Sequence, residues 1–285
     1  MVQLIRHIRE SLQPYLPPSE ISAISRVICC EILGVSTRDY FMRNSLDLTN
    51  EQRATLDSVL KRLKNQEPLQ YIQGEAPFLG RQFKVTPAVL IPRPETAELV
   101  DYIIHNEPHE ELQVLDIGTG SGCIAISLKL SLKNSSVYAW DISSEALEIA
   151  SCNAENLHAY ITLDKVDCLS DELPQAPSSL DIIVSNPPYI TPIEQKEMEE
   201  NVLKWEPHKA LFVPQEHPLL FYDHIADIAC RRLREGGRLY VEINQAYGEE
   251  TCRLLEEKGF CNILLHKDLS GKDRYISSQF YLQKT

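Results

Sequence analysis

The stretch of the sequence with the clearest chemical capacity is Ser185-Asn186-Pro187-Pro188-Tyr189, which follows the apolar run 180–184. The apolar run is typical of a buried strand. Asn186 precedes a proline, which favours extended backbone, and the two prolines have fixed φ and no N–H, so the strand must end here. The stretch therefore leaves an amide side chain, carbonyl oxygens and an aromatic ring at the end of a strand.

These groups suit a ligand that carries a flat NH2 group. Carbonyl oxygens of Asn186 and Pro187 can accept its two N–H donors, and the ring of Tyr189 can pack on its face. In open α/β proteins, ligands bind outside the carboxyl ends of the strands. The alternative interpretation is a proline turn that only ends the strand, with Asn186 as an ordinary turn residue.

A glycine-rich turn, Gly118-Thr119-Gly120-Ser121-Gly122, links a predicted strand at 114–117 to a predicted helix at 123–130. Such a turn lets a ligand approach the backbone and meet free N–H groups of the helix. Asp141 ends the next predicted strand, 19 residues after Gly122, where an acid that binds ribose hydroxyls is expected. A helix cap is the alternative role for Asp141. Together these features indicate an adenosine-containing ligand, with NAD and S-adenosylmethionine as the candidates.

Two further pairs of residues are candidates for the same site. Asp167 and Cys168 follow the third predicted strand, where a carboxylate could accept an adenine amino group and a side chain could flank the base; loop packing is the alternative. Arg93 and Glu95 lie in a proline-fixed loop ahead of the glycine turn. They are expected either to form a surface salt bridge or to make a lip of the active site.

The chain has 285 residues and a formal net charge of −13, and the charge is unevenly distributed. Residues 1–75 carry nine basic and nine acidic side chains, whereas residues 76–285 carry 19 and 32. An acidic surface repels phosphate, so no direct nucleic-acid partner is expected. The sequence shows no signal peptide and no apolar run long enough to span a bilayer, which predicts a cytoplasmic protein without a membrane partner. The eight cysteines form no C-x-x-C pair, which favours reduced thiols. His105 and His109 have the spacing of helical metal ligands, but Pro108 between them prevents a shared face, so no metal site is expected.

Residues 1–73 are predicted to form a helical domain. Ser19 precedes apolar residues at helical spacing up to Ile32, with Gly34 just beyond, which predicts a capped amphipathic helix. A second helix is expected to begin near Thr49. Because the domain has balanced charge and no catalytic cluster, we expect it to recognise a partner rather than to perform chemistry.

Residues 74–92 are predicted to form a β-hairpin linker, with strands at 75–78 and 82–85. Over 93–285, predicted strands alternate with helices, which calls for a mostly parallel sheet covered on both faces. A helix over 217–233 is predicted to close at Gly236-Gly237 and to lead to a strand over 238–243. A last helix and two antiparallel strands complete this α/β domain.

Over most of its length the sequence resembles the peptide chain release factor glutamine methyltransferases, which depend on S-adenosylmethionine. The proline-rich run 90–96 is the most specific part of the resemblance. The resembling residues are Pro68–Ile72, Gly74, Phe83–Thr96, Asp116–Gly122, Asp141, Asn186–Tyr189, Gly236-Gly237 and Asp273-Arg274.

The resemblance implies a fold, a substrate and a set of site residues. The implied fold is a seven-stranded, Rossmann-like methyltransferase domain behind an N-terminal helical bundle. The implied substrate is the glutamine of the Gly-Gly-Gln loop in class I, bacterial-type release factors, and we expect a monomer. By position, Gly118–Gly122 and Asp141 would hold the cofactor, and Asn186–Tyr189 would hold the glutamine.

Three positions depart from the family pattern. Asn244 replaces a usual glycine, Cys168 stands where an aromatic residue is common, and 212–216 replaces expected glycines. These departures are expected to affect the adenine pocket and one surface loop.

The expected reaction is a direct displacement, in which the amide nitrogen of the bound glutamine attacks the sulfonium methyl without a strong general base. The alternative enzyme is an N6-adenine methyltransferase of DNA or RNA, because the same tetrapeptide could seat a flipped base. An adaptor that only binds release factors would show no affinity for the cofactor. An NAD dehydrogenase would leave residues 186–189 without a role.

Overall fold

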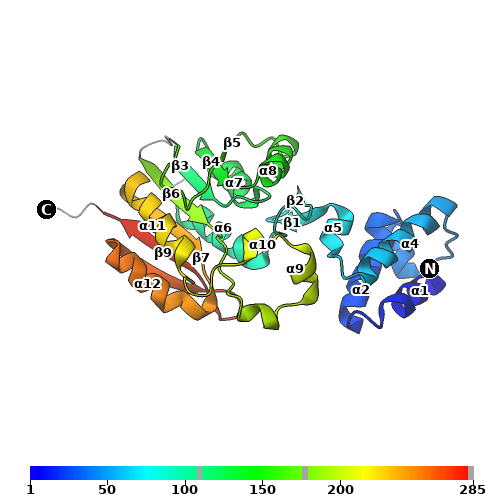
Figure 1. Ribbon diagram of the computed structural model, residues 1–285. Coiled ribbons are helices and arrows are strands. Elements are labelled where there is room, and N and C mark those ends of the chain that lie inside the picture. Colours follow the sequence, from blue (N-terminus) through cyan, green and yellow to red (C-terminus); the bar gives the residue numbers. More distant parts are fainter. Residues whose placement is uncertain (108–110, 175–178, 282–285) are drawn as a thin grey trace. The chain divides into compact units, whose positions relative to one another are not determined.

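The structure is a computed structural model that describes residues 1–107, 111–174 and 179–281 (Figure 1). The chain divides into two compact units. The first consists of Met1–Gly74 and Glu199–Trp205, and the second of Glu75–Met198 and Glu206–Thr285. Pro108 and His109 lie outside the described residues. In the described residues, no helix combines the length and the apolar character that crossing a membrane requires.

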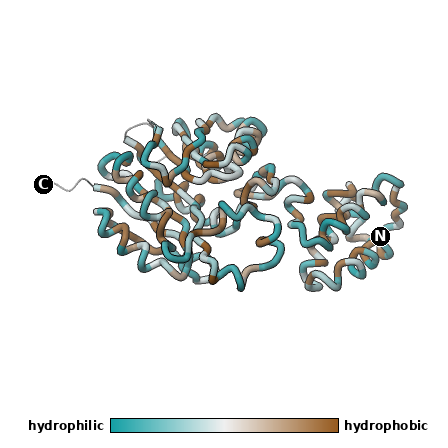
Figure 2. Tube along the Cα trace, viewed as in Figure 1, coloured by the Kyte–Doolittle hydropathy of each residue, from teal (hydrophilic) through white to brown (hydrophobic). Residues whose placement is uncertain are grey.

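The first unit is helical and has a hydrophobic core of its own. Figure 2 shows hydrophobic and hydrophilic stretches alternating along its helices, as expected where each helix buries one face. The core includes Ile8, Ile28 and Leu60, which are at most 4% exposed. The helices are α1 (Val2–Leu12), α2 (Pro18–Val27), the π-helix η1 (Ile28–Ile32), α3 (Thr37–Met42), α4 (Asn50–Lys64) and α5 (Leu69–Gln73).

The predicted start of a helix near Thr49 is confirmed, whereas the predicted cap of another helix is not. Helix α4 begins after Thr49 with a full capping box, in which Thr49 and Gln52 exchange side-chain and backbone hydrogen bonds. The prediction that Ser19 caps the other helix was wrong. Helix α2 begins at Pro18 with Pro17 as N-cap and has no side-chain cap, because the side chain of Pro17 has no hydrogen-bond acceptor.

A segment distant in sequence completes the first unit. It contains α9 (Glu200–Trp205). Lys204 Nζ donates to the main-chain oxygen of Asn65 at 3.2 Å and to Asn65 Oδ1 at 2.6 Å. The indole N–H of Trp205 donates to the same main-chain oxygen at 3.2 Å. The cap of α4 is therefore tied to residues that follow the Asn-Pro-Pro-Tyr stretch.

The second unit begins with the predicted hairpin, β1 (Glu75–Phe78) and β2 (Arg81–Lys84). Leu79 and Gly80 both have positive φ, as a tight two-residue hairpin turn requires. Phe78 and Phe83 belong to the core of the second unit. The hairpin therefore packs as part of this unit.

A seven-stranded sheet forms the centre of the second unit, with strand order β5-β4-β3-β6-β7-β9-β8. Strands β5, β4, β3, β6 and β7 are parallel, and β9 and β8 are antiparallel. This confirms the predicted seven-stranded α/β fold. The strands are β3 (Gln113–Ile117), β4 (Ser136–Asp141), β5 (Thr162–Lys165), β6 (Leu180–Ser185), β7 (Leu233–Glu242), β8 (Phe260–Lys267) and β9 (Asp273–Phe280).

Helices cover both faces of the sheet, because successive strand residues point to opposite sides. Val114 belongs to one core cluster and its neighbour Leu115 to the other. The first cluster includes residues of α6 (Pro94–Asn106), α7 (Cys123–Ser131) and α8 (Ser144–Asn156). The second includes residues of α11 (Leu220–Arg232) and α12 (Gly248–Glu257).

The predicted role of Gly236 and Gly237 as the end of a helix was wrong. Helix α11 ends at Arg232 and β7 begins at Leu233, so both glycines lie inside the strand. The pairing of β6 with β7 shifts register between Leu180 and Ile182. A Cβ on Gly237 would lie 3.0 Å from the main-chain oxygen of Leu180, so glycine permits this irregularity in the strand.

Candidate active site

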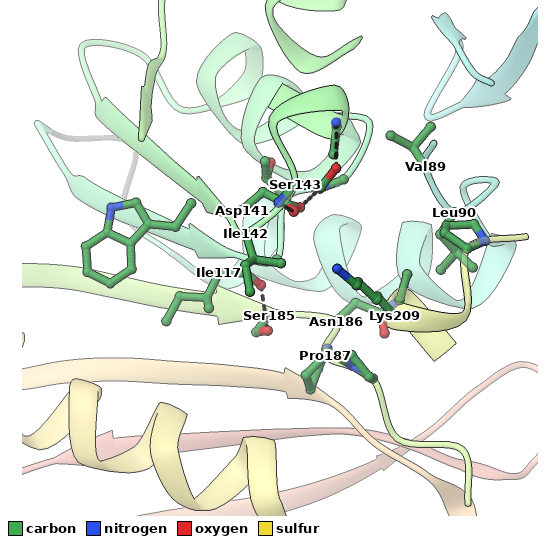
Figure 3. Close-up of a pocket in the computed structure, with 18 of the residues that line it drawn as sticks. Val89, Leu90, Ile117, Asp141, Ile142, Ser143, Ser185, Asn186, Pro187 and Lys209 are labelled. Atoms are coloured by element: carbon green, nitrogen blue, oxygen red, sulfur yellow. Dashed lines mark hydrogen bonds between the residues drawn. The ribbon is translucent and has the colours of Figure 1, made fainter. Parts of the chain in front are cut away.

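The second unit contains a cavity of about 500 Å³ at the carboxyl ends of β3, β4 and β6 (Figure 3). Strands β3 and β6 are neighbours although β4 and β5 come between them in sequence. The direction of chain winding therefore changes at this pair, which is where open α/β sheets bind ligands. The volume is typical of a small-molecule site.

The glycine turn forms one wall of this cavity. Gly118, Thr119, Gly120 and Ser121 line it. The N–H groups of Gly118 and Thr119 both donate to the main-chain oxygen of Trp140 at 2.9 Å, which fastens the turn to the end of β4. Gly118 and Gly120 have φ of +76° and +54°, a conformation that favours glycine.

Gly122 does not line the cavity, in contrast to the other residues of the turn. It has φ of +80° and precedes α7. A Cβ at this position would lie 2.9 Å from Ile126 Cδ1 and 3.2 Å from Ala150 Cβ. The described contacts therefore give this glycine a packing role between α7 and α8.

Asp141 ends β4 at the cavity wall. Its Oδ2 accepts from the N–H of Gly120 at 2.8 Å and its Oδ1 from the N–H of Ser143 at 2.9 Å (Figure 3). The side chain that caps α8 is Ser143, which accepts from the N–H of Ala146. Burial raises the pKa of Asp141. The carboxylate thus faces the cavity and is held by the glycine turn.

Asp167 and Cys168 also line the cavity. Asp167 Oδ1 accepts from the N–H of Leu169 at 2.9 Å, so the carboxylate shapes its own loop as well as the cavity wall. Burial raises the pKa of the Cys168 thiol to about 12. A thiol in this state is a neutral wall residue rather than a nucleophile.

Strand β6 ends at Ser185, as predicted, and Asn186, Pro187 and Pro188 line the cavity directly after it. The hydroxyl of Ser185 donates to the main-chain oxygen of Ile117 at 2.7 Å and fixes the end of β6 against β3 (Figure 3). Asn186 Nδ2 donates to Thr96 Oγ1 at 3.0 Å. The N-terminal end of α6 therefore supports the amide that the sequence singled out.

Tyr189 has a different position from its three neighbours. It does not line the cavity, and it packs against the core cluster that includes residues of α11 and α12. Its hydroxyl donates to Glu242 Oε1 at 3.1 Å. In the structure the tyrosine is thus directed toward a buried carboxylate behind the cavity.

Arg93 lines the cavity and forms an ion pair, but its partner is not Glu95. Its guanidinium donates to Glu206 Oε1 at 2.6 Å, and Glu206 Oε2 accepts from the N–H of Ile91 at 3.3 Å. The side chain of Glu206 is 1% exposed. Glu95 is half-buried and does not line the cavity. The proline-rich loop is thus clamped by a buried carboxylate that lies 113 positions further along the chain.

Sequence reasoning missed three residues of this region. Lys209, from α10 (His208–Leu211), points across the cavity in the direction of Ile142 (Figure 3). Thr96 lines the cavity, and Glu242 lies behind it at the end of β7. One signal was present for Glu242, because a carboxylate that ends an apolar strand at the ligand edge of a sheet is unusual.

Two of the departures from the family pattern have different consequences from those expected. Asn244 does not line the cavity. Its Nδ2 donates to the main-chain oxygen of Tyr189 at 3.0 Å and to Glu194, so it anchors the segment after the tetrapeptide. Phe212 lines the cavity and Val213 is 2% exposed, so the segment 212–216 is not only a surface loop.

Comparisons with known proteins agree with this geometry. Residues 96–206 match the family described as Methyltransferase small domain, and residues 3–74 match the PrmC N-terminal domain. The release factor glutamine methyltransferase of Bacteroides thetaiotaomicron is 50% identical over 98% of this chain and 99% of its own length. That of Flavobacterium psychrophilum is 44% identical over 95% of this chain and 96% of its own. A methyltransferase structure from Pyrococcus furiosus shares the fold, with a TM-score of 0.52, 16% identity, and coverage of 82% of this chain and all of that one.

The fold and the cavity define a Rossmann-like, S-adenosylmethionine-dependent methyltransferase. This identification excludes the dehydrogenase and adaptor interpretations. The chain belongs to the release factor glutamine methyltransferase family.

Proposed function

We propose that this protein transfers a methyl group from S-adenosylmethionine to the side-chain amide nitrogen (N5) of the glutamine in the Gly-Gly-Gln loop of peptide chain release factors. The observation that supports this most is that Asn186 and Pro187 line the same cavity as the glycine turn. Membership of the family supports glutamine rather than adenine as the acceptor.

The cavity residues fit S-adenosylmethionine in size and chemistry. The carboxylate of Asp141 is suited to accept hydrogen bonds from ribose hydroxyls. The side chains of Asp167 and Cys168 line the part of the cavity that is proposed to hold the adenine base. Gly118 and Gly120 allow a ligand to approach the backbone closely. When bound, the cofactor would supply an electrophilic methyl group on its sulfonium, and S-adenosylhomocysteine would leave as the neutral thioether.

The oxygens of Asn186 and Pro187 are proposed to accept the two N–H groups of the acceptor carboxamide. An amide nitrogen is a weak nucleophile because its lone pair is delocalised into the carbonyl group. Two hydrogen bonds from its N–H groups shift electron density toward nitrogen and fix the direction of attack. Positioning of this kind can lower a barrier by roughly 7–11 kcal/mol. The proton can leave after transfer, so no strong general base is required.

The first unit is proposed to recognise the release factor. Its core is separate from that of the methyltransferase unit, and it matches the PrmC N-terminal domain. We further propose that the substrates are class I release factors of the bacterial type, and that the protein acts as a cytoplasmic monomer without a direct nucleic-acid partner. The excess of acidic side chains over residues 76–285 supports the last point.

The direct test is to incubate the protein with isotope-labelled S-adenosylmethionine and a purified class I release factor, and to locate the label by mass spectrometry. We expect one methyl group on the glutamine of the Gly-Gly-Gln loop and none on a factor in which that glutamine is replaced. Label on adenine of a DNA or RNA duplex, with none on the release factor, would support the adenine alternative and contradict this proposal.

A further inference from the structure

A buried carboxylate lies behind the Asn-Pro-Pro-Tyr stretch. Glu242, the last residue of β7, is 1% exposed. Its Oε2 accepts from the hydroxyl of Thr96 at 2.6 Å, and its Oε1 accepts from the hydroxyl of Tyr189 at 3.1 Å. Burying a carboxylate is costly unless its oxygens are satisfied, so both hydroxyl bonds are needed in this place.

The hydrogen bond between Thr96 and Glu242 determines the direction of the hydrogen bond between Thr96 and Asn186. At a pH well above the value of about 7 to which burial raises the pKa of Glu242, this carboxylate is ionised and has no proton, so Thr96 must donate its only hydroxyl proton to Glu242. Toward Asn186, the oxygen of Thr96 can therefore only accept. The Asn186 atom 3.0 Å away must be the donor Nδ2, whichever way the amide would otherwise turn.

The direction of this hydrogen bond determines what the oxygen of the Asn186 amide can do. Asn186 lines the cavity, and its Nδ2 is used by Thr96. Among the residues that the structure describes, no donor forms a hydrogen bond with Asn186 Oδ1. This oxygen is thus left as the acceptor that the side chain can offer to a ligand.

We propose that Thr96 and Glu242 are positioning residues for methyl transfer, which hold the Asn186 amide with its oxygen toward the acceptor. The proposal rests on the proposed function, because an acceptor NH2 group needs an oxygen opposite it. In the reversed orientation Asn186 would direct its own NH2 group at the acceptor NH2 group. Two donors would then face each other, and the acceptor nitrogen would lose both a hydrogen bond and its alignment.

Variants of Thr96 separate this role from simple packing. Thr96→Val keeps the shape but removes the hydroxyl, and Thr96→Ser keeps the hydroxyl. Thr251→Val is the matched control. Thr251 is fully buried in α12, its hydroxyl donates to the main-chain oxygen of Tyr247 at 2.7 Å, and it does not line the cavity.

The kinetic readout is kcat for release factor methylation, with the Kd for S-adenosylmethionine measured by calorimetry. Assays are run near pH 8.5, about 1.5 units above the pKa of about 7 to which burial raises Glu242. We expect Thr96→Val to lower kcat about 10- to 100-fold with the cofactor Kd within about twofold. Thr96→Ser should recover kcat to within about threefold of wild type, and Thr251→Val should leave it unchanged.

A second readout does not depend on activity. In 15N-labelled protein, the Nδ2 protons of Asn186, assigned with Asn186→Ala, should exchange slowly with water in wild type and in Thr251→Val, and rapidly in Thr96→Val. Rapid exchange in wild type, a normal kcat in Thr96→Val, or no recovery in Thr96→Ser would each overturn the proposal. Absence of release factor methylation by wild type would instead contradict the proposed function, and the exchange measurement would still decide the orientation of the amide.

Discussion

The main-chain oxygen of Asn186 lies 4.0 Å from the position that a Cβ on Gly118 would occupy. The two residues are 68 positions apart in sequence, and they meet because β3 and β6 pair in parallel with Ile117 opposite Ser185. Gly118 and Asn186, which follow these two strands, therefore lie next to each other at the same edge of the sheet. This adjacency brings the proposed acceptor site next to the proposed cofactor site.

Gly118→Ala is expected to weaken cofactor binding. The φ of +76° strains any residue with a Cβ by about 1 kcal/mol, and the added methyl group would stand at the cavity wall. We expect the Kd for S-adenosylmethionine, measured by calorimetry, to rise at least about tenfold. Gly271→Ala is the control, because Gly271 has φ of +80° and no atom within 4 Å of its Cβ position. It should lose similar stability at unchanged Kd; equal Kd values for both variants would contradict the account.

Arg93→Met is expected to destabilise the methyltransferase unit. It removes the partner of Glu206, whose side chain is 1% exposed, and leaves a buried carboxylate without a counter-charge. Because Arg93 is one-third exposed, we expect a loss of about 2 kcal/mol in the free energy of unfolding, below the range for fully buried pairs.

The double variant Arg93→Met/Glu206→Gln tests whether the unpaired charge of Glu206 causes this loss of stability. It should recover part of the lost stability, because the buried charge is gone. Arg253→Met, which breaks an exposed pair with Glu249, is the control and should change stability by less than about 0.5 kcal/mol. Denaturant unfolding measures these differences, and equal losses in Arg93→Met and Arg253→Met would show that the pair does not clamp the loop.

The ionisation of Glu242 predicts a pH dependence of stability. Burial raises its pKa from 4.5 to about 7, although bonds from Thr96 and Tyr189 and the charge of Arg274 act in the opposite direction and Glu95 adds to the rise. Between these pH values the folded state keeps a proton that the unfolded state releases, so stability falls as pH rises from about 4.5 to above 7. Glu242→Gln has no such proton.

The measurement is the difference in free energy of unfolding between wild type and Glu242→Gln as a function of pH. The difference should be constant below about pH 4.5 and should shift in favour of the glutamine variant by about 3 kcal/mol by pH 8. Tyr222 and Cys123 also face Glu242, but their raised pKa values leave them neutral over this range. A flat difference across pH 4.5–8 would show that Glu242 is ionised with an ordinary pKa.

The sequence predicted the parts of the site whose signal is local. Two prolines after an apolar run end a strand in any fold, so the end of β6 could be predicted. The glycines of 118–122 favour a tight turn whether or not a ligand is present. Asp141 could be predicted because its spacing from the turn is set by one helix and one strand.

The rest of the site depends on strand order and side-chain direction, which no local pattern contains. Thr96 and Glu242 are 146 positions apart and meet only when β7 is placed beside β6. The partner of Arg93 could not be predicted for the same reason, and the nearby Glu95 was the wrong alternative. Gly122 and Tyr189 were expected to contact ligands, but neither lines the cavity, because Gly122 packs between two helices and the hydroxyl of Tyr189 bonds to a buried carboxylate.

Asn186 is proposed to align the acceptor amide without being needed to hold the cofactor, and the variant Asn186→Ala tests this role. The measurement is the single-turnover rate of release factor methylation at saturating S-adenosylmethionine, beside the cofactor Kd, with Asn156→Ala on the exposed end of α8 as control. We predict a rate at least about 100-fold below wild type, a Kd within about threefold, and a normal control. A near-normal rate in Asn186→Ala, or a loss of rate that follows entirely from lost cofactor binding, would contradict the account.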